Sequence, residues 1–370
     1  RASMRWKILA LTPLLVWTLV LPARAAVDQG EILAAQEEAL DVDELERAAG
    51  ESGGEIDYGT SLEEGLGQIL DTGSQEIGSI VRRAVRSGVL ILLILLLCGL
   101  ADSLWTGLNQ QGISTVALAG TLAVSAVSVA DVNSLLGLGR EAIGNMVSFA
   151  NVLLPAVAAV TAATGAVTGA TVRQMAAVLF SDALVNLINS LLIPLLYAYI
   201  AACVANAALG NEGLKRLSGL FKWAVTAILT TVMLAFVGYL TVSGVVAGTA
   251  DAMSVKAAKF AISGAIPVVG GILSDAAETI LASAGVLKGT VGVFGMLTIL
   301  AICLLPLLQM AVHYLLYKVA AALSATVGTG TLCSLVDQIG GAFGLMMGMT
   351  GACCLLLFIA LVSSVSVVAA

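Results

Sequence analysis

Long apolar stretches separated by short polar segments occupy the chain from residue 88 to residue 370. A helix needs an apolar run of about 20 residues to cross the hydrocarbon of a bilayer. Seven runs are close to this length or longer, over residues 88–106, 113–132, 143–164, 175–209, 220–246, 291–311 and 341–368. The pattern therefore predicts an all-α, polytopic membrane helix bundle, with about seven spanning helices in a multi-spanning domain over residues 88–370.

The residues before this domain divide into two parts. Residues 1–26 have a basic start, an apolar centre and a small-residue end, PARAA, which is the pattern of a secretory signal peptide. The alternative is an uncleaved first spanning helix, although the apolar centre is short for a span. Residues 27–87 are polar, begin with a run of acidic side chains and contain few apolar residues. We expect them to form a short, exported, extracytoplasmic arm.

Basic residues give a conflicting indication of membrane orientation. A cleaved signal peptide would export residues 27–87 and leave Arg82, Arg83 and Arg86 outside, next to the first span. The positive-inside rule prefers such residues in the cytoplasm. A retained first span would remove the conflict, and a re-entrant helix further along the chain is a second solution. The sequence leaves the side of the C-terminus open.

One apolar segment, residues 251–290, differs from the others because it carries several charges. A small and acidic helix face consists of Gly271, Ser274, Asp275 and Glu278, and the helix breakers Pro267 and Gly270 precede it. The spacing predicts an amphipathic or re-entrant helix. Carboxylates are costly in lipid, so this face should meet protein, water or the membrane surface. The acids could form a cation or proton site or a general acid/base pair, or they could pair with nearby lysines or form a solvated stripe on a surface helix.

Other polar residues lie inside the predicted spans. Asp182, Asn186 and Asn189 share one face of the helix over residues 175–209. Such groups can build an ion or proton path, or they can join helices by hydrogen bonds, and we favour the second interpretation. His313, the single histidine, lies close to Tyr314, Tyr317 and Lys318. We interpret this group as an interfacial anchor rather than a proton relay.

Composition excludes several classes of function. The chain is 59% hydrophobic and 11% charged, with a mean hydropathy of +1.02, which is not the balance of a soluble protein. No basic face is available for nucleic acid. The six cysteines contain no CxxC pattern, so neither a disulfide framework nor a zinc site is indicated. We find no phosphate-binding loop and no histidine-based triad, and we expect no cofactor, no metal and no enzymatic activity.

The segment KAAKFAISGAIPVVGGILSDAAETILASAGVLKGTVG resembles the most distinctive part of the stage III sporulation protein AE family of endospore-forming bacteria. The shared pattern falls on residues 259–260, 266–270, 274–279 and 287–292, and YKVAAAL at residues 317–323 is also similar. The resemblance covers most of the chain from the first predicted span onward. It makes the face that contains Asp275 and Glu278 the first candidate for a functional site.

The resemblance implies a non-enzymatic subunit of the channel, similar to a secretion system, that joins mother cell and forespore. It implies a location in the mother-cell membrane around the forespore, and a need for the protein in forespore integrity and late forespore gene expression. The implied partners are the other stage III A-operon membrane proteins, their cytoplasmic ATPase, the forespore stage II protein Q and the lipid bilayer. The alternative is an autonomous ion-coupled transporter or permease that uses Asp182, Asp275 and Glu278.

Overall fold

The computed structural model describes residues 42–105, 115–163, 178–242, 290–325 and 330–365, all within one compact unit, Val42–Ala370. The elements are α3 (Val42–Glu51), α4 (Leu62–Trp105), α5 (Thr115–Ala163), the π-helix η2 (Ile188–Leu192), α7 (Ile193–Leu209), α8 (Glu212–Val242), α11 (Thr290–Ser324) and α12 (Gly330–Val365). An α-helical segment over residues 178–187 leads directly into η2. No strand occurs in these ranges, so the predicted all-α class is confirmed. The predicted signal peptide lies outside them, and so do the helix breakers Pro267 and Gly270 and the acidic face formed by Gly271, Ser274, Asp275 and Glu278.

Six described helices are long and apolar enough to cross a membrane, and the chain is a multi-pass membrane protein. They are α4, α5, the helix Val178–Leu209, α8, α11 and α12. From the hydropathy pattern we expected separate spans over residues 113–132 and 143–164. The structure instead has one continuous helix, α5, because the residues between them include helix-compatible side chains and no proline.

The length of α5 matters for its place in a bilayer. Its 49 residues measure about 74 Å at 1.5 Å per residue, more than twice the thickness of the hydrocarbon layer. Two apolar stretches, residues 115–130 and 142–163, flank a polar segment that contains Asp131, Asn133, Arg140 and Glu141. The continuous helix therefore cannot lie in one hydrocarbon layer along its whole length.

Helix α4 is also longer than the span predicted within it. Ser61 caps its first turn, because the Ser61 Oγ accepts a hydrogen bond from the Glu64 N–H at 3.2 Å. From there the helix runs without a break through the polar residues 62–87 into the apolar residues 88–105. The boundary that we predicted between arm and membrane domain, at residue 87, thus falls inside one helix.

Glycines bring α4 close to α11 along its length. A Cβ atom on Gly65 would lie 2.3 Å from Leu297 Cδ1, and one on Gly88 would lie 2.3 Å from Leu316 Cδ2. The residue numbers of the contacting positions increase in the same direction along both helices, so α4 and α11 run parallel. Because the Cα atoms of α4 can approach so closely, its polar first half packs directly on the apolar first half of α11.

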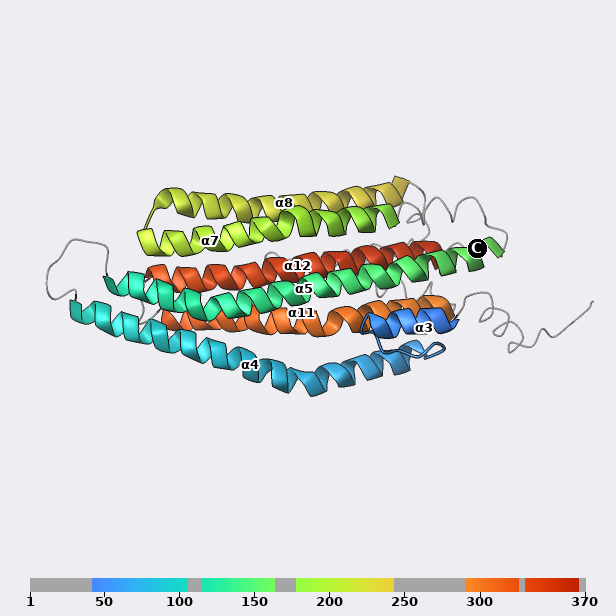
Figure 1. Cartoon of the computed structure of the whole chain (residues 1–370), viewed down its shortest axis with the longest axis horizontal. Helices are drawn as coiled ribbons and strands as arrows, with labels where there is room; N and C mark the ends of the chain where they lie inside the picture. The colour runs from blue at the N-terminus through green and yellow to red at the C-terminus, as the bar shows by residue number, and fades with distance from the viewer. Residues whose placement is uncertain (1–41, 106–114, 164–177, 243–289, 326–329, 366–370) are drawn as a thin grey trace, which may run out of the picture. The chain divides into compact units, whose positions relative to one another are not determined.

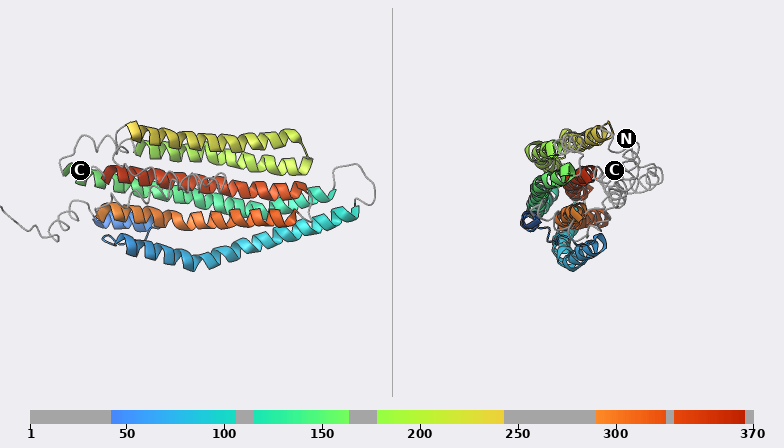
Figure 2. Two further views of the ribbon diagram at one scale, coloured as in Figure 1. Left: turned by 180° about the vertical axis from the view of Figure 1, so that it is seen from behind. Right: turned by 90° about the vertical axis from the view of Figure 1, so that its right-hand side faces the viewer.

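From α4 onward, helices that follow one another along the chain run in opposite directions (Figure 1). Helices α11 and α12 share the most extensive contacts, and α12 also packs against α5 and α7. Seen end-on, α12 and α5 lie between the α7–α8 pair and α11, and α4 is outermost (Figure 2). The core is therefore centred on α12 and α11, whose side chains include most of the fully buried phenylalanines.

A tight turn joins α7 to α8, and it depends on Gly210. This residue ends α7 in the left-handed conformation, with a φ angle of 61°, and its N–H donates to the Asn206 carbonyl at 2.8 Å. We expect Gly210→Val to lower the free energy of unfolding by about 1–2 kcal/mol, because a β-branched residue is strained there.

A matched control is available in the next helix. Gly219 has ordinary helical geometry, and a Cβ atom there would meet no atom within 4 Å. Gly219→Ala should therefore raise stability slightly. Thermal unfolding of the purified protein in detergent would compare the two variants. Equal midpoints for Gly210→Val and the wild type would show that the turn does not require a glycine.

Candidate functional site

A partly buried polar cluster joins α4, α5 and α11 near the middle of the bundle. Its centre is Asp131 on α5, whose Oδ2 accepts a hydrogen bond of 2.8 Å from the Tyr317 hydroxyl on α11. The Asp131 Oδ1 accepts a second bond, of 3.0 Å, from Ser87 Oγ on α4. Ser128, one helical turn before Asp131, places its hydroxyl 3.3 Å from the Tyr317 hydroxyl. Both carboxylate oxygens thus have partners, from two different helices.

These hydrogen bonds explain how a carboxylate can lie among apolar helices. An unpaired carboxylate that is shielded from water is costly, whereas one that accepts two hydrogen bonds is partly compensated. Tyr317 is fully buried and Ser128 is 1% exposed, so little water can reach this side of the cluster. The arrangement fixes the relative position of three helices, and it also places an acidic group where a cation or proton could bind.

Helix α12 forms the other wall of the cluster. The ring of Phe343 packs edge-on against the Tyr317 ring, with centroids 5.0 Å apart, and it also contacts His313 at 6.1 Å. The backbone of α12 comes close at Gly340, where a Cβ atom would lie 3.0 Å from Tyr317 Cβ. The Tyr317 ring therefore packs against α12, while its hydroxyl group bonds to Asp131 and Ser128 on α5.

Further polar contacts continue from the cluster toward the start of α12. Lys318 Nζ forms an ion pair of 2.6 Å with Asp337 Oδ1, and both side chains are about half-exposed. The Tyr199 hydroxyl on α7 donates to the Gln338 carbonyl at 3.0 Å. A layer of polar groups therefore crosses α4, α5, α11, α12 and α7.

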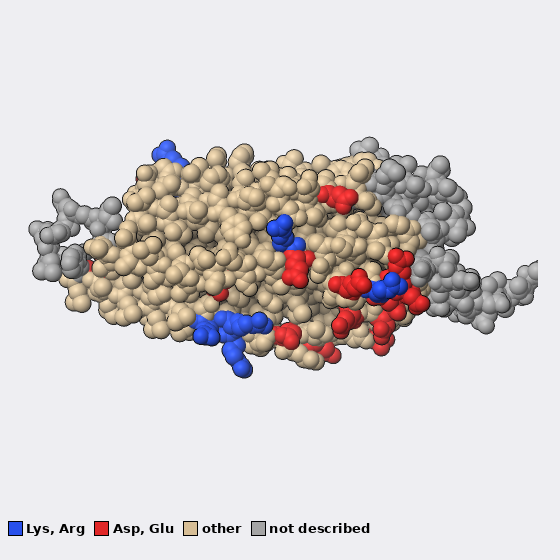
Figure 3. Space-filling model, in the orientation of Figure 1, with Lys and Arg blue, Asp and Glu red and all other residues tan. Residues whose placement is uncertain are grey.

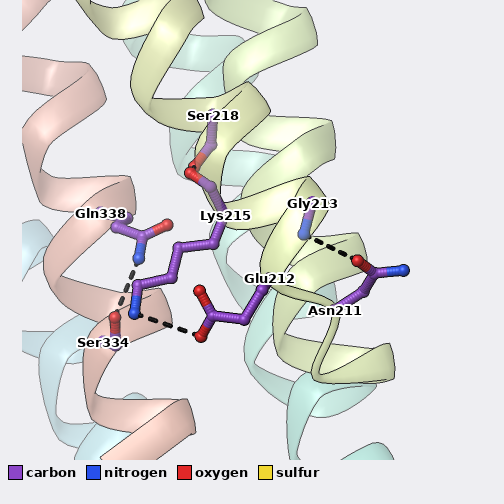
Figure 4. A network of polar contacts seen from close by, with 7 residues as sticks. All are labelled: Asn211, Glu212, Gly213, Lys215, Ser218, Ser334 and Gln338. Carbon is purple, nitrogen blue, oxygen red and sulfur yellow. Dashed lines mark hydrogen bonds and ion pairs between the residues drawn. The ribbon is translucent and has the colours of Figure 1, made fainter.

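The start of α8 lies beside this part of α12 (Figure 4). Gln338 Nε2 donates to Ser334 Oγ at 2.8 Å, and on α8 Lys215 forms an exposed ion pair of 3.6 Å with Glu212. Within the described ranges the buried Gln338 Oε1 has no hydrogen-bond partner. An exposed ion pair of this kind contributes little to stability. The hydrogen bond from Tyr199 on α7 to α12 is therefore the stronger contact in this part of the layer.

The structure separates the predicted polar residues of the fourth span from this cluster. Asp182 and Asn186 are exposed, and Asn186 Oδ1 accepts a local bond of 3.0 Å from Ser190. Asn189 lies within η2, and its buried Oδ1 has no partner in the described part of the chain. In the described part of the chain, no hydrogen bond or ion pair links these residues to Asp131.

His313 occupies a different environment from the interfacial one that we expected. It is 8% exposed and packs on Phe343, and its Nδ1 contacts the Gln309 carbonyl of the preceding turn at 2.8 Å. From the sequence we assigned no role to Asp131 or Ser87. A lone acid at the end of an apolar run was the available signal, but its partners lie 44 and 186 residues away along the chain.

The sulfur atoms form a smaller contact inside the bundle. Cys303 on α11 and Cys354 on α12 are buried, and their Sγ atoms lie 3.3 Å apart as free thiols. In the described residues no group of three or more histidine, cysteine or acidic side chains could hold a metal ion. These thiols therefore contribute packing at the α11–α12 interface.

Comparison with known proteins identifies the family. The family model for stage III sporulation protein AE matches residues 54–368, which include every described helix from α4 to α12. The chain belongs to the stage III sporulation protein AE family. It is 26% identical over 255 residues to stage III sporulation protein AE of Bacillus subtilis (strain 168), a match that covers 68% of this chain and 63% of that protein.

Membership of the stage III sporulation protein AE family implies a role in sporulation, as the resemblance of residues 251–292 indicated. The chain spans less than two thirds of the length of its Bacillus subtilis relative. No solved structure matches the chain. The polar cluster around Asp131 therefore has to be interpreted from its own geometry.

Proposed function

We propose that this protein is a non-enzymatic integral membrane subunit of the channel, similar to a secretion system, that links mother cell and forespore. The observation that carries the proposal is the match of the stage III sporulation protein AE family to residues 54–368. Six apolar helices of spanning length support a membrane location, which we place in the mother-cell membrane around the forespore. The subunit would serve forespore integrity and late forespore gene expression.

The geometry of the polar cluster supports a structural part in such a complex. Asp131, Ser87 and Tyr317 bond to one another across α4, α5 and α11. A groove between α4 and α5 is lined almost entirely by apolar residues, and none of the three residues of the cluster lines it. A cluster that is closed on itself fixes helix positions, which suits a platform on which other subunits assemble. The partners that we propose are the other stage III A-operon membrane proteins with their ATPase, and stage II protein Q from the forespore.

Deletion of the gene in its own host tests the proposal. We expect small forespores with weak late transcription after engulfment, and rescue of both by the wild-type gene. A deletion strain that forms normal spores would contradict the sporulation role and would favour the alternative, an ion-coupled transporter. In that case ion-dependent uptake in cells that produce the protein would be the next measurement.

The acidic face that contains Asp275 and Glu278 is the first target for variants. We expect Asp275→Ala/Glu278→Ala to fail to rescue the deletion strain, because the resemblance to the family is strongest around these residues. The membrane content of the variant must equal that of the wild type, which an immunoblot of the membrane fraction would measure. Asp182→Ala is the control, since Asp182 is exposed and lies apart from the polar cluster. Full rescue by the double variant would show that the acidic face is not needed for sporulation.

A further inference from the structure

Three arginines lie on the exposed face of α4 at the point where its polar half meets its apolar half. Arg82, Arg83 and Arg86 are all exposed. Arg83 Nη2 donates to Ser79 Oγ at 3.3 Å, whereas Arg82 and Arg86 form no ion pair with any residue that the structure describes. Figure 3 shows a basic patch over α4, between the acidic end of the molecule and a surface with few charges. Uncompensated guanidinium groups at such a boundary are suited to an anionic partner.

The same face of α4 continues as an exposed apolar stripe. Positions three, four or seven apart share a helix face, and Arg83, Arg86, Leu90, Leu93 and Leu97 follow this spacing. The three leucines are between 44% and 65% exposed. A ligand on this face would therefore meet positive charge at one end and aliphatic side chains along the rest of its length.

A groove between α4 and α5 lies further along this stripe. The α4 side of the groove includes Ile94, Leu97 and Ala101, and its α5 side includes Val116, Ala119 and Ala123. Its volume is about 500 Å³, and its lining is almost entirely apolar. The small side chains on α5 keep it open. It is large enough to hold part of an acyl chain.

The spacing between the charge and the groove matches one leaflet of a bilayer. Leu97 is eleven residues after Arg86, which corresponds to about 16 Å along the helix. Half the hydrocarbon thickness of a bilayer is about 15 Å. A headgroup held at Arg86 would therefore place the end of its acyl chain at the groove.

We propose that this face of α4, from Arg82 to Ala101, together with the α5 side of the groove, is a binding site for an anionic diacyl phospholipid. The phosphate group lies against Arg83 and Arg86, because guanidinium groups bind phosphate through paired hydrogen bonds. One acyl chain follows Leu90 and Leu93 into the groove. An acidic protein segment would satisfy the arginines but not the apolar stripe, so the two features together favour a lipid.

Lipid retention by the purified full chain tests the site. The protein would be equilibrated with vesicles of equimolar phosphatidylglycerol and phosphatidylcholine, extracted mildly, and analysed by native mass spectrometry. We expect the wild type to retain phosphatidylglycerol at least about tenfold more than phosphatidylcholine. Arg83→Gln/Arg86→Gln should reduce this preference roughly 25-fold, or to parity, because a basic residue near the surface is worth about fivefold in binding.

Two further variants separate the parts of the site. Lys215→Gln/Arg216→Gln makes the same change of charge on α8, where both side chains are exposed, and should leave the preference unchanged. Ala119→Phe fills the groove and should reduce retention of phosphatidylglycerol while the arginines remain. Equal retention of both lipids by the wild type would overturn the proposal and would leave the basic patch to an acidic protein partner. An equal loss in the α8 control would also overturn it, because binding would then follow net charge alone.

Discussion

Asp131→Ala is expected to destabilise the bundle more than any other single change to its polar residues. The substitution removes the acceptor of the Tyr317 and Ser87 hydroxyl groups, which lie 2.8 Å and 3.0 Å from its carboxylate oxygens. Hydrogen bonds between membrane helices are individually weak, but bonds to a charged acceptor are stronger, and the buried Tyr317 hydroxyl would lose its principal partner. We expect a loss of about 2 kcal/mol in the free energy of unfolding.

Thermal unfolding in detergent would measure this loss, with Asn133→Ala as the matched control. Asn133 is two residues further along the same helix, and its exposed Oδ1 accepts one long bond, of 3.3 Å, from Tyr197. Its removal should cost less than about 0.5 kcal/mol. Asp131→Asn keeps an acceptor of the same shape and should fall between the two. If Asp131→Ala behaved like Asn133→Ala, the cluster would not hold the three helices together.

Phe343→Ala is expected to have the second large effect, through packing rather than hydrogen bonding. The Phe343 side chain is fully buried on α12, and its ring contacts both Tyr317 and His313 on α11. Removal of a buried aromatic ring leaves a cavity that the surrounding helices fill only in part. We expect a cost of about 3 kcal/mol, with an increase in the mobility of the Tyr317 ring.

The control for this change is Leu315→Ala on α11. Leu315 is 58% exposed, so its truncation leaves no internal cavity and should alter stability little. A double-mutant cycle between Phe343→Ala and Tyr317→Ala would isolate the contact between the two rings, for which edge-on packing predicts about 1 kcal/mol of coupling. A coupling near zero would show that Phe343 does not support the cluster through Tyr317.

The two expected effects bear on how the bundle holds its polar layer. Asp131 connects α4, α5 and α11 by hydrogen bonds, and Phe343 on α12 packs against Tyr317 on α11. Without hydrophobic burial between helices in lipid, specific contacts of this kind decide which helix faces meet. Variants of either residue that remain in the membrane would also test whether this layer is needed for sporulation.

The sequence by itself determined the helical class and the position of most membrane segments. Apolar runs such as residues 291–311 and 341–368 are long and carry no charge. In a bilayer the backbone polar groups of such a run must form hydrogen bonds within the protein, so a helix is the favoured structure. The motif at residues 259–292 was by itself enough to indicate the family. The sequence did not reveal that residues 113–132 and 143–164 form one helix, because hydropathy places a boundary at Asp131 and Arg140 although both residues are compatible with a helix.

Only the tertiary structure decided which polar residues meet. Asp131 and Tyr317 are 186 residues apart, and their contact depends on the direction and rotation of α5 and α11, which local periodicity does not encode. Close approach at Gly65 and Gly88 likewise depends on the leucines that face them from α11. Asp182 and Asn186, which lie inside a predicted span, are exposed, whereas Asp131, at the end of an apolar run, connects three helices. Helix formation is a local property of the chain, whereas the choice of contacting faces follows from packing between distant segments.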